Sequence, residues 1–124
     1  MRFQGYFREF LKALTLVSLV LCATPPTLAA SPEAEIDHLL NFIAASPCAF
    51  IRNGVAYDSA QAVDHIKDKY DYYRSDIRSA EDFIALAATK SAMSGKPYLV
   101  ECDGTIEPAA DWITRELAAF RQRS

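Results

Sequence analysis

The sequence has little of what marks several large classes of protein. Among its 124 residues there are only four glycines, six prolines and two histidines, and Lys and Arg form no long run. So little glycine and proline excludes collagen-like and low-complexity chains. A pI near 5.3 without a basic cluster argues against nucleic-acid binding, which needs a positively charged surface.

Sequence motifs of familiar catalytic and metal sites are also missing. The chain has no GxSxG, SxxK or HExxH motif and no CxxC pair. Ser91 and Ser94, close to Gly95, are more typical of a turn than of a hydrolase nucleophile. His38 and His65 are too few for a zinc site, and we expect His38 at the solvent edge of a helix. We therefore predict no metal, no cofactor and no catalytic residue.

The composition is that of one folded domain. Hydrophobic residues make up 51% of the chain and charged residues 23%, with 13 Lys and Arg against 16 Asp and Glu. This balance is too apolar for a disordered chain, and the length is that of a single domain. We therefore expect one hydrophobic core.

The first 29 residues have the layout of a secretory signal peptide. Three basic side chains precede an apolar run over 13–23, and small residues follow up to Ala30. The run of about eleven residues is well short of the roughly 20 that a membrane-spanning helix needs. We predict cleavage after Ala29, with cleavage after Ala30 as the alternative, and no membrane span after cleavage.

Cys22 raises the alternative of a lipoprotein signal, in which the cysteine after the apolar run is acylated. Leu21 directly precedes this cysteine, whereas the processing peptidase accepts small residues there. We therefore favour a plain cleaved signal peptide over 1–29.

The predicted mature domain, 30–124, retains two cysteines. Removal of 1–29 leaves 95 residues with 10 basic and 15 acidic side chains, a formal charge of about −5. In an oxidising compartment Cys48 and Cys102 are most simply explained as one disulfide, because two thiols 54 positions apart make no metal site alone. Closing a loop of that size would stabilise the domain by about 4 kcal/mol.

Two segments in the first half of the domain have the apolar spacing and the caps of helices. The first helix is predicted over 32–45 with Ser31 as its cap. The second begins at the capping pair of Asp58 and Gln61 and ends near Arg74. We expect its buried face to carry Ala62, His65, Ile66, Tyr70 and Tyr73.

Two further helices are predicted in the second half. One follows the cap residue Ser79, and the last begins at Pro108. The apolar positions of the last helix place Trp112 in the core.

Two segments predict strands. Residues 49–57 flank the pair Asn53-Gly54, which suits a tight hairpin turn. A short apolar run over 98–102 is predicted as another strand, closed by the turn pair Asp103-Gly104.

The disulfide constrains how these strands pair. Joining Cys48 to Cys102 brings the start of the first strand to within about 6 Å of the end of the last, measured between Cα atoms. Antiparallel pairing follows most easily. We therefore predict an α+β domain in which about four helices surround a small antiparallel sheet.

Four motifs follow one another along the predicted domain: FIRNG at 50–54, AxxHxxxK at 62–69, SAEDFI at 79–84 and SGKPY at 94–98. Together they resemble the YfeK-like family of small exported bacterial proteins with a domain of unknown function. The resemblance covers nearly all of 30–124. It implies a periplasmic protein of a Gram-negative bacterium, and it implies no activity, ligand or catalytic residue.

One group of residues has the chemistry of an anion site. His65 and Lys69 are four positions apart and share a helix face, and Arg52 and Asn53 would approach them from the hairpin. With Tyr98 they would hold a carboxylate or phosphate through the guanidinium fork, the ammonium and the imidazole.

A purely structural explanation of the same residues is favoured. In that explanation His65 lies at the edge of the core with a hydrogen bond to the backbone. Arg52 and Lys69 then pair with nearby acids such as Asp64 or Asp68.

Three tyrosines lie near the predicted end of the second helix, close to Arg74. Tyr70, Tyr72 and Tyr73 cannot all face one core, because neighbouring helical positions point in different directions. We expect Tyr72 to be exposed, and an exposed tyrosine beside an arginine is typical of a contact surface. A solvated helix end explains these residues equally well.

The functional prediction rests on two observations. The sequence has signs of export, and it has no set of residues typical of a catalytic site. We predict a periplasmic, non-enzymatic protein that binds an unknown periplasmic protein or envelope component, with Tyr72 and Arg74 as candidate contacts. The alternative is a small anionic-ligand binder, or an enzyme, that uses the region of Arg52, His65 and Lys69.

Overall fold

The computed structural model describes residues 19–22 and 29–124. Most of the predicted signal peptide lies outside these residues, so the signal peptide stays a prediction. Within the described ranges, no helix has both the length and the apolar character needed to cross a membrane.

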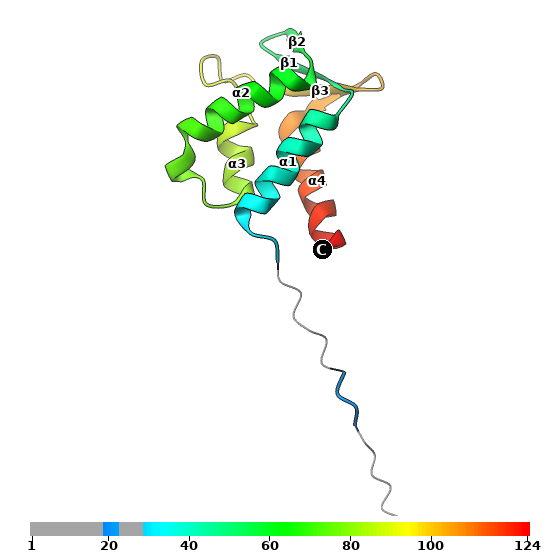
Figure 1. The fold of residues 1–124 in the computed structure, drawn as a ribbon. Helices are drawn as coiled ribbons and strands as arrows, with labels where there is room; N and C mark the ends of the chain where they lie inside the picture. Colours follow the sequence, from blue (N-terminus) through cyan, green and yellow to red (C-terminus); the bar gives the residue numbers. More distant parts are fainter. Residues whose placement is uncertain (1–18, 23–28) are drawn as a thin grey trace, which may run out of the picture.

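From Pro32 onward the chain forms four α-helices, four short strands and one 3-10 turn. The elements are α1 (Pro32–Ala45), β1 (Ala49–Arg52), β2 (Val55–Tyr57), α2 (Ser59–Tyr72), a 3-10 helix η1 (Arg74–Asp76), α3 (Ala80–Ala87), β3 (Leu99–Cys102), β4 (Thr105–Pro108) and α4 (Ala109–Arg123). Figure 1 shows the strands gathered at one end of the domain, with the helices extending away from them. The predicted α+β class is confirmed.

The helices begin at side chains that bind their free backbone N–H groups. Ser31 caps α1, which has the predicted bounds. Asp58 and Gln61 form the predicted capping box of α2, and the hydroxyl of Ser79 accepts from the N–H of Asp82 (3.0 Å) at the start of α3.

The inward face of α2 differs from the prediction. The helix ends at Tyr72 and a 3-10 turn follows, so the predicted end near Arg74 is slightly late. The buried residues of α2 are Ala62, Val63 and Ile66. The remaining predicted core positions are only half-buried: His65, Tyr70 and Tyr73. Each of these carries a polar atom on an apolar ring, which favours a position at the edge of the core.

The strands form one antiparallel sheet in the order β2-β1-β3-β4. Two tight turns have the backbone that Asn-Gly and Asp-Gly pairs favour, with φ of 51° and 78° at Asn53 and Gly54 and 49° and 80° at Asp103 and Gly104. Both turns therefore connect paired strands.

The fourth strand is a correction to the sequence analysis. Asp103-Gly104 was predicted to end the last strand, but it turns the chain back into β4, and Pro108 ends β4 instead of starting α4. Proline cannot donate a ladder hydrogen bond, and β4 tolerates it because β4 is an edge strand.

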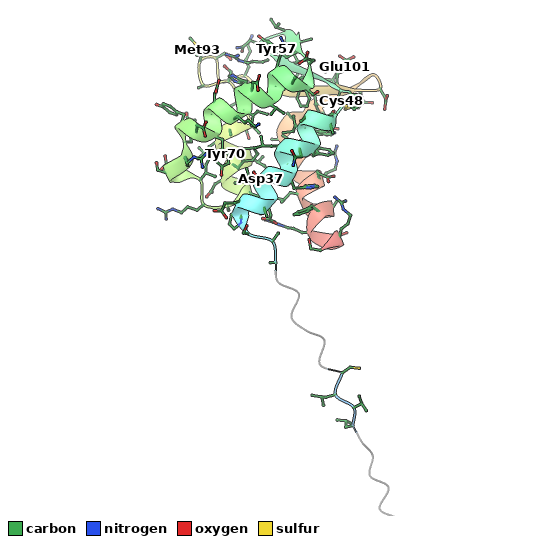
Figure 2. All side chains as sticks on the ribbon, in the orientation of Figure 1. Asp37, Cys48, Tyr57, Tyr70, Met93 and Glu101 are labelled. Carbon is green, nitrogen blue, oxygen red and sulfur yellow. A yellow bond between two sulfur atoms is a disulfide. The ribbon has the colours of Figure 1, made fainter. Side chains whose placement is uncertain are left out.

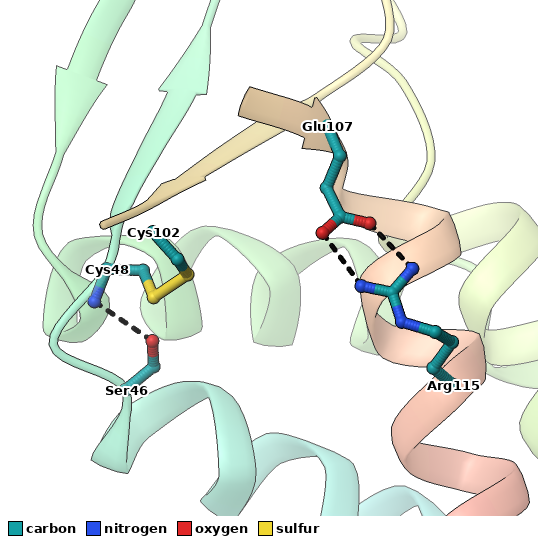
Figure 3. The surroundings of a disulfide bond; sticks show 5 residues. All are labelled: Ser46, Cys48, Cys102, Glu107 and Arg115. Atoms are coloured by element: carbon teal, nitrogen blue, oxygen red, sulfur yellow. Dashed lines mark hydrogen bonds and ion pairs between the residues drawn. A yellow bond between two sulfur atoms is a disulfide. The ribbon is translucent and has the colours of Figure 1, made fainter. Parts of the chain in front are cut away.

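The disulfide between Cys48 and Cys102 links β1 to β3, with the two Cα atoms 4.8 Å apart. It lies next to the paired residues Ala49 and Glu101, which confirms the predicted antiparallel pairing. Figure 3 shows the bridge at the end of the two strands, where the backbone N–H of Cys48 also donates to the Ser46 hydroxyl (3.0 Å). The covalent bond and the backbone ladder therefore hold the same strand pair.

The core lies between the helices and the inward face of β1 and β3. Its largest fully buried apolar side chains are Leu39, Ile43, Phe83, Val100 and Ile113. Trp112, predicted in the core, is half-buried and packs on the rings of Phe42 and Phe50, with centroids 4.4 and 5.6 Å away.

Ion pairs join α4 to α1 and α3. The guanidinium of Arg121 donates to both oxygens of the buried Glu35 (2.7 and 2.9 Å) and pairs with Glu81 (2.6 Å). His38, predicted at the solvent edge, is half-buried, because its Nε2 lies 2.8 Å from Glu116 and its ring stacks on Phe120.

The Cys48→Ser/Cys102→Ser variant is expected to lower the free energy of unfolding by about 4 kcal/mol, because the bridge restricts the unfolded chain. Urea unfolding of the purified protein measures this difference. The reduced wild-type protein, as control, should unfold at the same urea concentration as the variant. A difference of less than about 1 kcal/mol between the oxidised protein and the variant would contradict the stabilising role.

Candidate functional site

A hollow of about 130 Å³ lies between the β1–β2 hairpin and α2. We call it the apolar hollow. Its lining residues come from the hairpin, α2, the ends of α3 and α4, and the residue before β3: Phe50, Ile51, Arg52, Tyr57, Gln61, Ala62, His65, Ile66, Ala88, Tyr98 and Ala109. Three of the five predicted ligand residues are among them.

The strand register brings Arg52 and Tyr98 together. Ile51 pairs with Leu99 in the antiparallel ladder of β1 and β3. One step further in the same register, Arg52 lies opposite Tyr98. Side chains alternate between the two faces of a strand, so both residues share the inward face with Phe50. The disulfide lies on this ladder as well and therefore supports the same register.

Arg52 has an enclosed atom without a partner. Its Nε is buried, and within the described residues it makes no hydrogen bond. Nor does any ion pair in that part of the chain include Arg52. Buried polar atoms of native proteins are nearly always bonded, so an enclosed N–H without a partner is unusual. The Arg52 side chain as a whole lines the hollow.

His65, Tyr98 and Lys69 form a hydrogen-bonded chain. His65 and Lys69 lie one helical turn apart on α2. The ammonium of Lys69 donates to the Tyr98 hydroxyl (3.2 Å) and to the backbone carbonyl of Lys90 (2.7 Å). The Tyr98 oxygen lies 2.9 Å from Nε2 of His65.

The pKa shifts in this chain have a common cause. Burial and the positive charges of Arg52 and Lys69 lower the pKa of His65, although Asp68 acts in the opposite direction. Burial, Arg52 and then Lys90 lower the pKa of Lys69. Burial raises the pKa of Tyr98, which favours the protonated hydroxyl beside Nε2 of His65.

A second hollow of about 350 Å³ adjoins the first and shares Arg52, His65 and Tyr98 with it. The other residues that line it are Asp68, Lys69, Tyr72, Tyr73, Ser91, Ala92 and Met93. Lys69 belongs to this second hollow only. The three shared residues therefore lie between the two hollows.

The pairings of the favoured structural explanation do not occur. Within the described chain, no ion pair joins Arg52 or Lys69 to Asp64 or Asp68. His65 bonds the Tyr98 hydroxyl and not the backbone. The positive groups thus remain without a carboxylate contact.

Asn53 lies apart from this group. It is exposed at the hairpin turn, and its amide contacts the hydroxyls of Ser91 and Ser94 (3.4 and 2.5 Å). It lines neither hollow. Its contacts fasten the hairpin to the loop that precedes β3.

The two candidate partner contacts face different surroundings. Tyr72 is 80% exposed, as expected, and lines the second hollow together with Met93. Figure 2 shows Met93 projecting from the loop between α3 and β3. Arg74 instead pairs with Asp71 (2.7 Å) and lies over the ring of Tyr70.

Tyr57 and Gln61 also line the apolar hollow, although neither is among the site residues predicted from the sequence. A two-residue turn at Asn53-Gly54 makes Tyr57 the partner of Phe50, and paired residues share a face. That register signal was present in the sequence. Gln61 is used at the same time in the capping box, where its side-chain oxygen accepts from Asp58.

The described part of the chain has no cluster of side chains that could bind a metal ion. No group of three or more His, Cys, Asp or Glu side chains lies close enough there to hold an ion.

Comparison with known proteins identifies the family. Residues 30–121 match DUF5329, a family of unknown function. The chain belongs to this family. It is similar to Uncharacterized protein YfeK of Salmonella typhimurium, with 36% identity over 92 residues that span 71% of this chain and 77% of the relative. The predicted YfeK-like membership is thus confirmed. No solved structure matches the chain.

In this DUF5329 member, His65 is expected to make stability depend on pH. Its lowered pKa means that the folded state binds the proton less readily than the unfolded state does. The free energy of unfolding should therefore fall as the pH drops below the ordinary histidine value of about 6.5, and it should level off below the lowered pKa.

Urea unfolding between pH 8 and 5 tests this dependence, a range chosen to lie above the titration of the glutamates. The His65→Gln variant should lose the decline that His65 causes. The His38→Gln variant keeps His65 and serves as the control. An equal decline in the wild type and in His65→Gln would contradict the role of His65.

Proposed function

We propose that this protein binds a small anionic ligand in the periplasm, through Arg52, His65, Lys69 and Tyr98. The observation that carries the proposal is that Arg52, His65 and Lys69 line two adjoining hollows, while no ion pair in the described chain joins Arg52 or Lys69 to a carboxylate. An anion in these hollows would supply the missing charged acceptor.

The neighbouring charges support the same ligand class. Lys69 donates to two neutral oxygens and, among the described residues, to no carboxylate, although acidic residues outnumber basic ones in the chain. Positive charges close together lower the pKa values of His65 and Lys69. An anion at this place would relieve that repulsion, whereas a cation would increase it.

Export is part of the proposal. The signal-peptide layout of 1–29 and the Cys48–Cys102 disulfide both support an oxidising compartment, and the family resemblance points to the periplasm. A free extracytoplasmic anion would then reach the site without crossing the inner membrane.

Titration with acetate and with inorganic phosphate, followed by thermal unfolding and by calorimetry, tests anion binding. The Arg52→Ala variant is expected to lose affinity about tenfold or more, because a hydrogen bond to a charged group contributes about 1.5–3 kcal/mol. Arg52→Lys, which keeps the charge but not the planar fork, should recover only part of the affinity.

Lys67→Ala is the matched control, since Lys67 is exposed on α2 and lines neither of the two hollows. It removes the same charge as Lys69→Ala but should leave binding unchanged. If anions stabilise wild type, Arg52→Ala and Lys69→Ala alike, the stabilisation is a general salt effect and the proposed site is wrong.

A second candidate function is contact with a periplasmic protein through Tyr72. The observation that favours it is the exposure of two large side chains at the rim of the second hollow, 80% for Tyr72 and 92% for Met93. Tyrosine and methionine are enriched at protein interfaces.

Crosslinking in the native periplasm, with identification of the captured protein, tests this contact. Tyr72→Ala should reduce the yield of the crosslinked complex, because it removes a large side chain that an interface would bury. Ile106→Ala, which shortens an exposed apolar residue on β4, should not reduce the yield. Equal yields for both variants and the wild type would exclude Tyr72 as a contact.

A further inference from the structure

The apolar hollow has two kinds of wall. Rings and aliphatic groups form most of it, namely Phe50, Ile51, Tyr57, Ala62, Ile66, Ala88 and Ala109. The polar groups of the lining belong to Arg52, Gln61 and the hydrogen-bonded pair of His65 and Tyr98. A ligand that fills this space must therefore be apolar over most of its surface and polar at one end.

The volume of the hollow suits a small apolar body. Its volume of about 130 Å³ is close to that of an engineered apolar cavity of about 150 Å³ that binds benzene. Inorganic phosphate would leave the apolar walls without contact and would have to lose its hydration against them. One six-membered ring or a short branched chain fits the space and the walls.

Three alanines create this space. Ala62 lies in the first half of α2, Ala88 caps the end of α3, and Ala109 begins α4. All three are buried although they line a hollow. A larger side chain at any of them would occupy the volume.

The charge of the ligand's polar end follows from the side chains of the hollow that have no carboxylate partner in the described chain. Two donor positions of Lys69 are occupied by Lys90 and Tyr98, and the lowered pKa of His65 disfavours its charged form. Among the described residues that line the apolar hollow, Arg52 is the one whose side chain keeps its charge at every ordinary pH, and no carboxylate in the described chain pairs with it. One positive charge with a planar fork matches one carboxylate.

We infer that the ligand is a small amphiphilic carboxylate, with a body about the size of a benzene ring in the apolar hollow and its carboxylate on Arg52. This inference rests on the proposed anion-binding function and names the ligand class of the same site. It also assigns Tyr57, Ala62 and Ile66 to the recognition of the apolar body.

Calorimetric titration of the purified, disulfide-bonded protein with acetate, benzoate and inorganic phosphate tests the inference. Benzoate should bind at least tenfold more tightly than acetate, because only benzoate fills the apolar walls. Arg52→Ala should weaken the binding of both carboxylates.

Two variants address the apolar walls separately. Ala62→Leu fills the hollow and should reduce benzoate affinity to that of acetate while leaving acetate unchanged. Ala85→Leu is the matched control, because Ala85 is exposed on α3 and lines a different hollow. If Ala62→Leu does not fold, Tyr57→Ala on the edge strand β2 removes a wall instead, and it should also lower benzoate affinity.

The outcomes separate the inference from the function on which it rests. Equal affinities for acetate and benzoate, or binding of phosphate alone, would overturn the amphiphilic ligand class and keep the anion site. Binding of benzoate that Arg52→Ala leaves unchanged would overturn both, as would no binding of any of the three anions.

Discussion

The antiparallel pairing of β1 with β3 is the constraint on which the site depends. Its register pairs Ile51 with Leu99, and one step further it brings Arg52 opposite Tyr98. At the other end of the same ladder, the Cys48–Cys102 disulfide joins the strands covalently. A slip of one residue would turn Arg52 to the other face of the sheet, away from His65. The bridge therefore stabilises the fold and also keeps a guanidinium beside a histidine.

The charges of the domain are distributed unevenly. At the helix interfaces arginines meet carboxylates, as Arg121 does with Glu35 and Glu81. In the candidate site Arg52 and Lys69 have no such partner in the described chain, although the whole chain is acidic. Structural arginines that are fully paired have little left to offer a ligand, whereas unpaired ones beside a hollow do. This contrast separates the scaffold from the site.

Short sequence motifs predicted those parts of the fold that depend on interactions between residues close together in the chain. Caps such as Ser31 and Ser79 satisfy N–H groups within one turn, so the start of each helix can be inferred from neighbouring residues. The strand β4 was missed because Thr105–Pro108 is short and ends in proline, and only pairing with β3 makes it a strand. Likewise, the sequence predicts the group of Arg52, His65, Lys69 and Tyr98 but not its contacts, because these join α2 to the residue that precedes β3.

Residues near each other in the chain determined the helix starts and the Asn53-Gly54 hairpin, since capping and turn conformation need only short segments. The number of cysteines and the signs of export predicted the Cys48–Cys102 bridge. Tertiary structure alone decided which charges stay unpaired. Lys69 contacts the carbonyl of Lys90, not Asp68 one position before it, and Nε of Arg52 is enclosed without an acceptor. Whether a charge is neutralised depends on which groups packing brings within about 3 Å, and sequence spacing does not specify that distance.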